Sequence, residues 1–229
     1  MSWEHWAESV LQRARTKLLE LATPWDKEQL DWAERHDLLT HGTALCPGYE
    51  EMYGPQIWGK DRVYDVARVK VSQDGQYDVV SIYISQWQER QTQIAVAIHI
   101  IRGLGYPPNR VEVLSDHVDI EVFGDDRKEL SLMHVEVKMD PRGLQESVSN
   151  TLRKSIDDTF QTREKLYDRL LEEKPKYALW VSRPKDGSAD TWDAYVKRAF
   201  KVKYYDDDGA TLEEISWDKV PNGPGWSAE

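Results

Sequence analysis

Two segments of alternating apolar and polar residues, separated by a short polar turn, are the feature that most constrains the fold. Residues 118–123 read Val-Asp-Ile-Glu-Val-Phe, and residues 133–138 read Met-His-Val-Glu-Val-Lys. A period of two is typical of strands that have one apolar and one polar face. Between them, residues 124–129 carry the glycine and aspartates of a tight turn. The sequence therefore predicts a β-hairpin.

Folding the chain about that turn brings charged side chains together. Symmetric pairing places Asp119 opposite Glu136, and Lys138 lies two residues further along the same face. Directly opposed side chains have Cβ atoms about 4.5–5.5 Å apart, so the two carboxylates repel each other unless a cation bridges them. Two carboxylates suit a hydrated Mg²⁺ or Mn²⁺, and a neighbouring lysine can stabilise an attacking hydroxide or the phosphate that it attacks. These residues predict the site of a metal-dependent phosphodiesterase.

The neighbouring titratable residues leave alternatives open. The same pairing places Glu121 opposite His134, where a plain hydrogen-bonded pair competes with a role in metal binding. His117 could also be a ligand or base, whereas Asp116 falls on the apolar face. Glu-x-Lys on a strand is often a solvated salt pair, and a second such triplet, 172–174, is interpreted as helix surface. The six histidines show no His-x-x-x-His spacing and the chain has no Cys-x-x-Cys, which argues against zinc.

The order of elements around the hairpin resembles a known enzyme superfamily. Apolar residues recur at helical spacing over 94–101, in a helix that begins near Gln88 and that Leu-Gly-Tyr-Pro at 104–107 ends. A strand at 111–114, the hairpin and a long helix over 144–173 follow. In this order the chain resembles the PD-(D/E)XK, or restriction-endonuclease-like, nucleases. The stretch over 89–154 looks most like the nuclease domain at the N-terminus of type I restriction enzyme R subunits. The resemblance implies an α/β fold with a mixed β-sheet flanked by helices.

The resemblance also implies roles for individual residues. Asp119 and Glu136 would be metal ligands together with the backbone carbonyl of Val137, and Lys138 would be the catalytic lysine. Glu89 would complete the metal site directly or through water. The implied reaction is in-line attack on phosphorus by a metal-bound water, with Mg²⁺ or Mn²⁺ as the cofactor. We therefore expect a hydrolase that cleaves phosphodiester bonds.

The chain departs from the family in two respects. The proline of the family signature is replaced by Val118, and no Gly-x-x-x-x-Gly-Lys-Ser/Thr motif occurs. The helicase motor of the type I R subunits depends on such a motif. We therefore expect that this chain does not itself translocate along DNA.

Candidate nucleic-acid contacts lie on the elements that follow the hairpin. In the superfamily, the helix after the lysine packs on the sheet near the active site, which favours its polar side chains as phosphate contacts. Further strands are expected over 176–182 and 199–205. Ordinary surface charge explains these basic residues equally well. The candidates are Arg142, Gln145 and Lys154 on the helix, and Arg198, Lys201 and Lys203 at the later strand.

The charge of the chain opposes binding to a polyanion. Its formal net charge is −11 at pH 7, whereas affinity for DNA comes largely from Lys and Arg. A local basic groove, bound divalent ions or a partner subunit would each offset this charge. We expect DNA rather than RNA as the substrate, in restriction, phage defence or repair, with a homodimer or a partner subunit. The alternatives are a catalytically silent interaction subunit with a nuclease fold and an acidic DNA-mimic inhibitor.

The length of 229 residues suits one α/β domain with an extension. We expect an accessory region over 1–85, a nuclease core over 86–205 and an acidic, Gly/Pro-rich tail over 206–229. The lone Cys46 precludes an internal disulfide, no apolar run is long enough for a membrane span, and the N-terminus is not a signal peptide. These features predict a cytoplasmic protein. Within the accessory region we expect helices over 3–21 and 26–39, a loop over 42–59, and strands over 62–71 and 77–84.

Overall fold

The computed structural model describes most of the second half of the chain and separate segments of the first. The described residues are 23–36, 39–40, 51–53, 56–57, 65–71, 77–81, 84–113, 118–125, 131–157, 159–161, 166–186, 188–205 and 209–226. The helix expected over 3–21 lies outside them. The chain divides into two compact units, Met1–Gln91 and Thr92–Glu229. Among the described residues, no helix combines the length and apolar character needed to cross a membrane.

The described residues of the N-terminal unit form helix α2, the first turns of α3 and short antiparallel strands. Helix α2 (Pro24–Arg35) begins with a reciprocal cap, because the Thr23 hydroxyl accepts a hydrogen bond from the Asp26 amide and the Asp26 carboxylate accepts one from the Thr23 amide. The pairing of Val71 with Tyr77 confirms the predicted hairpin. The strands are β1 (Leu39–Thr40), which pairs with β3 (Gln56–Ile57), and β2 (Glu51–Tyr53), β4 (Asp65–Val71) and β5 (Tyr77–Ser81), in the order β2-β4-β5.

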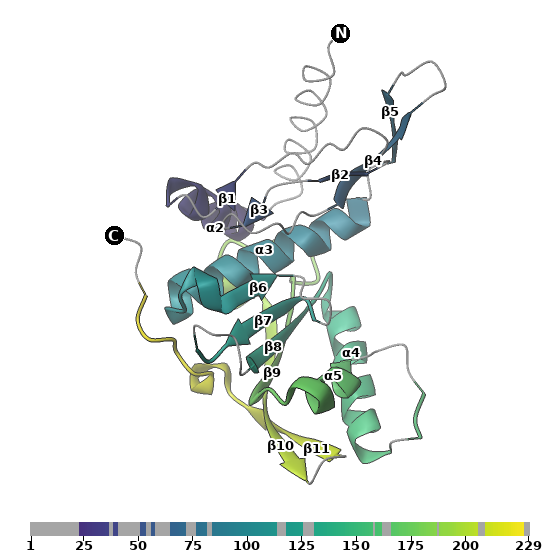
Figure 1. The fold of residues 1–229 in the computed structure, drawn as a ribbon, viewed down its shortest axis with the longest axis vertical. Coiled ribbons are helices and arrows are strands. Elements are labelled where there is room, and N and C mark those ends of the chain that lie inside the picture. Colours follow the sequence, from purple (N-terminus) through teal and green to yellow (C-terminus); the bar gives the residue numbers. More distant parts are fainter. Residues whose placement is uncertain are drawn as a thin grey trace. The chain divides into compact units, whose positions relative to one another are not determined.

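The C-terminal unit is built on a mixed sheet of six strands in the order β11-β10-β9-β8-β7-β6 (Figure 1). Strands β6, β7 and β8 form an antiparallel meander, β9 runs parallel to β8, and β10 and β11 are again antiparallel. A parallel neighbour needs a crossover connection, and helices α4 and α5 supply it. The α/β class with a mixed sheet is as predicted. The bounds are α3 (Ile84–Leu104), β6 (Val111–Val113), β7 (Ile120–Phe123), β8 (Ser131–Lys138), α4 (Pro141–Ile156), α5 (Leu166–Glu173), β9 (Tyr177–Ser182), β10 (Val196–Tyr205) and β11 (Gly209–Ile215).

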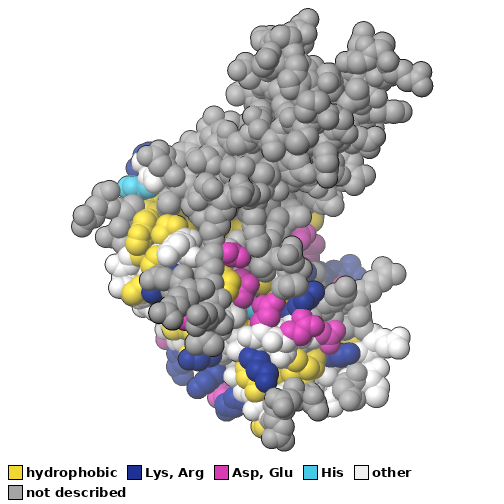
Figure 2. All heavy atoms as spheres, in the orientation of Figure 1, with side chains coloured by type: hydrophobic (Ala, Val, Ile, Leu, Met, Phe, Trp, Pro, Cys, Tyr) yellow, Lys and Arg dark blue, Asp and Glu magenta, His cyan; other side chains and the backbone are white. Residues whose placement is uncertain are grey.

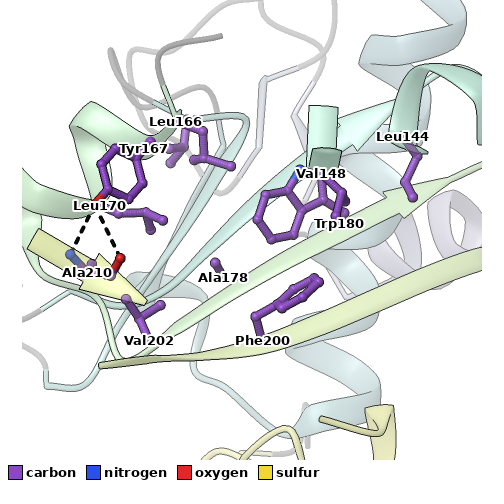
Figure 3. Packing of buried hydrophobic residues seen from close by; sticks show 11 residues of the cluster. Leu144, Val148, Leu166, Tyr167, Leu170, Ala178, Trp180, Phe200, Val202 and Ala210 are labelled. Atoms are coloured by element: carbon purple, nitrogen blue, oxygen red, sulfur yellow. Dashed lines mark hydrogen bonds between the residues drawn. The ribbon is translucent and has the colours of Figure 1, made fainter. Parts of the chain in front are cut away.

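Helices α4 and α5 cover one face of this sheet with an apolar core (Figures 1 and 3). In α4, Leu144, Ser147, Val148 and Thr151 are buried, at the spacing of one helical face. The indole of Trp180 on β9 is fully buried and meets the ring of Phe200 edge-on at 5.2 Å between centroids. Its Nε1 donates to Ser147 Oγ at 3.0 Å, so the one polar atom of this side chain is satisfied inside the core.

The prediction of one long helix over 144–173 is wrong, because two helices, α4 and α5, occupy this stretch. Helix α4 ends at Ile156, where Asp157 Oδ1 accepts hydrogen bonds from the Thr159 amide and hydroxyl. Such local side-chain bonds compete with helical ones and end the helix. The side chain of Ile156, which the apolar stripe predicted to be buried, is 87% exposed.

The predicted C-terminal tail over 206–229 is in part a sheet strand. Strand β11 pairs along β10, from Ala199 opposite Ile215 to Tyr205 opposite Gly209. Further on, the Gly223 amide donates to the Leu104 carbonyl at 2.7 Å. A Cβ atom on Gly223 would lie 2.4 Å from the Gly105 carbonyl oxygen, so this close approach of two backbones requires glycine. The Gly/Pro-rich composition therefore serves docking against the end of α3.

Removing the hydroxyl of Tyr167 is expected to destabilise the C-terminal unit. This hydroxyl donates to the Ala210 carbonyl at 3.2 Å and accepts from the Ala210 amide at 3.1 Å, and Ala210 is buried (Figure 3). Tyr167→Phe leaves both backbone groups without this partner, which should cost about 1–3 kcal/mol of unfolding free energy. The matched control is Tyr205→Phe, because that tyrosine is exposed and bonds Thr211 at the surface. Equal urea midpoints for the two variants would contradict this role.

Candidate active site

Asp119 is held in place at the start of β7. Strand β7 begins at Ile120, which pairs with Val135, so one further step along the ladder places Asp119 level with Glu136. Asp119 Oδ2 accepts a hydrogen bond from the Val137 amide at 2.7 Å, and Oδ1 accepts one from Gln93 Nε2 at 2.8 Å. Two donors from different elements therefore fix the orientation of this carboxylate.

Glu136 and Lys138 form the Glu-x-Lys motif and lie on one face at the end of β8, a central strand of the sheet. Lys138 Nζ and Glu136 Oε1 form an ion pair. Their side chains are 23% and 12% exposed, respectively, so the pair is close to the surface without being fully solvated. The predicted grouping of Asp119, Glu136 and Lys138 at one end of two neighbouring strands is consistent with these contacts.

The carbonyl of Val137 is directed toward the side of β8 on which Asp119 lies. In an extended strand, the N–H and C=O of one residue point to the same side. Because the Val137 amide donates to Asp119, its carbonyl oxygen faces the same side. The carboxylates of Asp119 and Glu136 and this carbonyl therefore belong to the same end of two neighbouring strands.

Gln93 is a contributor that sequence reasoning missed. It lies on α3, its side chain is buried, and its amide donates to Asp119. The adjacent Thr92 accepts a 2.6 Å hydrogen bond from Nε of the buried Arg183, which directly follows β9. Helix α3 is thus bonded to residues at the ends of two strands. Thr92 and Gln93 end the polar run 88–93, so nothing in the sequence marks them out from their polar neighbours.

The remaining predicted residues lie on α3, α4 and β10. Glu89 belongs to the part of α3 in the N-terminal unit, and its role at the site stays a prediction. Arg198 forms a two-pronged pair with Glu214, with both contacts at 2.7 Å, and also donates to Gln145 at 3.5 Å. Arg142 and Lys201 are exposed, Lys154 lies 3.9 Å from Asp168, and Lys203 pairs with Glu213.

Alternation along β10 separates the basic residues predicted on it. Arg198 lies on the same sheet face as Trp180, with which it pairs, whereas Lys201 and Lys203 lie on the opposite face. These three side chains therefore do not form one patch on the strand. Figure 2 shows acidic and basic side chains interspersed over the described surface that faces the viewer.

A second group of titratable side chains lies on the same sheet face as Glu136. The predicted pairing of Glu121 with His134 is confirmed, and Glu173 at the end of α5 joins them. His134 Nε2 lies 2.9 Å from Glu173 Oε2 and 3.8 Å from Glu121 Oε1. Burial alone lowers the pKa of His134, but its interactions with the two carboxylates outweigh this and raise the pKa above its usual value.

No protein-family model, curated protein or solved structure matches this chain. The geometry of the site therefore carries the functional argument together with the sequence pattern.

Proposed function

We propose that this chain is a divalent-metal-dependent nuclease that hydrolyses phosphodiester bonds of DNA. The observation that carries the proposal is that the Asp119 carboxylate bonds the amide of Val137, the residue between Glu136 and Lys138, which themselves form an ion pair. A role in restriction, phage defence or repair follows from the family resemblance alone.

The order of elements supports the proposal. Helix α3 is followed by the meander β6-β7-β8, then by α4 and α5, and then by β9, which pairs in parallel with β8. A helix, three strands, a helix and a strand is the order in which the sequence resembles the restriction-endonuclease-like nucleases. Asp119 directly precedes the second strand of this meander and the Glu-x-Lys motif ends the third, which are the positions that the resemblance implies.

The side chains fit a hard divalent cation. Asp119 and Glu136 contribute two carboxylates: that of Asp119 accepts hydrogen bonds from Gln93 and the Val137 amide, and that of Glu136 pairs with Lys138. Oxygen donors of this kind, with water, are the preferred ligands of Mg²⁺ and Mn²⁺. When bound, the ion would supply Lewis acidity by polarising a phosphate oxygen and acidifying water.

Lys138 would contribute the fixed positive charge of the site. Its ion pair with Glu136 holds the ammonium group beside that carboxylate. There it can donate hydrogen bonds to phosphate oxygens and stabilise the negative charge that grows in the transition state. Gln93 and the Val137 amide would keep Asp119 in a single orientation while the substrate binds.

A short polar surface next to the site offers contacts to the DNA backbone. The hydrogen bond between Arg198 and Gln145 shows that two of the predicted contacts, one on β10 and one on α4, adjoin each other. Arg198 is partly neutralised by Glu214, so a phosphate would compete with that carboxylate. Because the net charge of the chain is −11, we expect DNA binding to fall steeply with salt and to benefit from a partner subunit or a second copy.

The test is incubation of the purified full-length chain with supercoiled plasmid and with single-stranded DNA, in Mg²⁺, Mn²⁺ or EDTA. We expect cleavage with either metal and none with EDTA. An Asp119→Asn protein purified in parallel excludes a contaminating nuclease. Absence of cleavage in every condition, including at low salt, would contradict the proposal and favour an interaction module or a DNA mimic.

Gln93→Leu is expected to weaken the metal site without removing it. The substitution deletes the donor to Asp119 Oδ1, and loss of such an outer partner typically costs about 10–100-fold in metal affinity or activity. The measurement is the Mg²⁺ concentration that gives half-maximal cleavage. Gln161→Leu, at an exposed position, is the control. An unchanged Mg²⁺ requirement in Gln93→Leu would show that Gln93 only packs.

A further inference from the structure

Glu121, His134 and Glu173 bring three metal-binding groups together from three elements. One atom of each, an imidazole nitrogen or a carboxylate oxygen, lies within 4.8 Å of the other two. The His134 side chain is 0% exposed, that of Glu121 9% and that of Glu173 21%. The group is therefore enclosed by the sheet and α5, with an opening on the side of Glu173.

His134 contacts two carboxylates, but these contacts leave its ring nitrogens poorly satisfied for a fully buried side chain. Its Nε2 is close enough to Glu173 Oε2 to form a hydrogen bond, at 2.9 Å. Neither ring nitrogen, however, makes a hydrogen bond of normal geometry to any described residue. A fully buried ring with unsatisfied nitrogens is costly, because burial removes the water that would otherwise bond them.

The two distances from His134 Nε2 to the carboxylates are close to those between neighbouring ligands of a small metal ion. Bonds of about 2.0–2.1 Å in a tetrahedral site place neighbouring ligand atoms roughly 3.3 Å apart. The two contacts of His134 Nε2, at 2.9 and 3.8 Å, lie on either side of that value. An ion between the three atoms would accept the Nε2 lone pair and one oxygen from each of Glu121 and Glu173, with small movements of the side chains.

The charges of the three groups also favour a divalent ion. Two carboxylates this close in a largely buried position repel each other. A protonated His134 would balance one negative charge of Glu121 and Glu173, whereas a divalent ion bound to a neutral imidazole would balance both. A mixed set of one imidazole and two carboxylates suits Zn²⁺ and related transition metals better than Mg²⁺, which prefers oxygen ligands alone.

We propose that Glu121, His134 and Glu173 form a transition-metal site of the Zn²⁺ class, separate from the oxygen-lined site at Asp119. The ion joins the β7–β8 hairpin to the C-terminal end of α5. Water can occupy the remaining coordination position through the partly exposed side of Glu173. The proposal does not depend on nuclease activity. The sequence argued against zinc because it lacks the motifs that place two histidine or cysteine ligands in one segment. The three ligands proposed here come from three separate segments.

The experiment measures binding of Zn²⁺ by calorimetry and of Co²⁺ by its visible absorption, on the full-length chain in excess Mg²⁺. Mg²⁺ occupies the oxygen-lined site, so the remaining binding reports the histidine site. We expect one ion per chain and a rise in Tm of about 5–10 °C at a Zn²⁺ concentration about 100 times Kd. Asp119→Asn should retain this binding, which separates the two sites.

Glu173→Gln is the test variant, because it removes one ligand at a partly exposed helix end and preserves the size of the side chain. We expect at least about a 100-fold loss of Zn²⁺ affinity, since even outer partners of a metal site are worth about 10–100-fold. Glu172→Gln is the matched control, because its carboxylate is 59% exposed and pairs with Arg169. His134→Gln should likewise lose the Co²⁺ absorption.

Two results would overturn the proposal. One is no binding of Zn²⁺ or Co²⁺ by the wild-type chain in excess Mg²⁺, which would leave a protonated His134 between two carboxylates. The other is binding that Glu173→Gln and Glu172→Gln retain equally, which would place the ion elsewhere. Neither result bears on cleavage of DNA in Mg²⁺, so failure of this site and failure of the nuclease are distinguishable.

Discussion

Asp119→Asn is expected to lower Mg²⁺-dependent DNA cleavage by a factor of about 10³ or more. The substitution removes a negative charge from the proposed metal site. It also introduces an NH₂ group where both carboxylate oxygens now accept hydrogen bonds, from the Val137 amide and from Gln93. Whichever way the amide turns, its NH₂ faces a donor. We therefore expect a loss of Mg²⁺ binding together with a loss of about 1–3 kcal/mol of unfolding free energy.

The control for Asp119→Asn is Asp193→Asn. The side chain of Asp193 is 99% exposed, so the same change of charge there should leave both the cleavage rate and Mg²⁺ binding unaltered. Urea unfolding of the two variants separates a lost site from a lost fold. A folded Asp119→Asn protein that cuts at the wild-type rate would show that the metal site is assigned to the wrong residues.

The candidate site could be predicted because strand periodicity is a strong local constraint. A one-residue slip would exchange the polar and the apolar face of the hairpin, so the apolar residues fix the register. The observed pairing of Glu121 with His134 follows from this. Nothing comparable fixes how a helix approaches a strand. The contacts of Gln93 with Asp119 and of Glu173 with His134 therefore became visible only in the folded chain.

The elements that were predicted wrongly differ from the hairpin in the same way. The apolar spacing continues from α4 into α5, so periodicity alone could not reveal that Asp157 bonds Thr159 and ends the first helix. Strand β11 carries Glu213 and Glu214 among its few apolar residues. It is stabilised by pairing with β10 and by the Tyr167 hydroxyl, which are contacts with residues distant in sequence.

Lys138→Met is expected to abolish cleavage as thoroughly as Asp119→Asn, by a factor of about 10³, but with the opposite effect on metal binding. Methionine keeps the length and apolar stem of the side chain and removes only the ammonium group. Glu136 then loses the cation that competes for its carboxylate, so Mg²⁺ should bind as tightly as in the wild type or more tightly. Calorimetric titration with Mg²⁺ and plasmid cleavage, performed on the same preparation, measure the two effects.

The opposite shifts in Mg²⁺ affinity distinguish a lysine that acts on the phosphate from one that only holds the site together. Lys176→Met is the control. That side chain is exposed and directly precedes β9, whereas Lys138 pairs with Ser182 at the last residue of β9. If Lys138→Met loses Mg²⁺ affinity along with cleavage, the ion pair with Glu136 is a structural support of the metal site, and the charge acting on the phosphate must come from another residue. If Lys138→Met still cuts while Asp119→Asn does not, the metal ion alone supplies the positive charge. Only retained Mg²⁺ binding with lost cleavage places the ammonium group of Lys138 at the reacting phosphate.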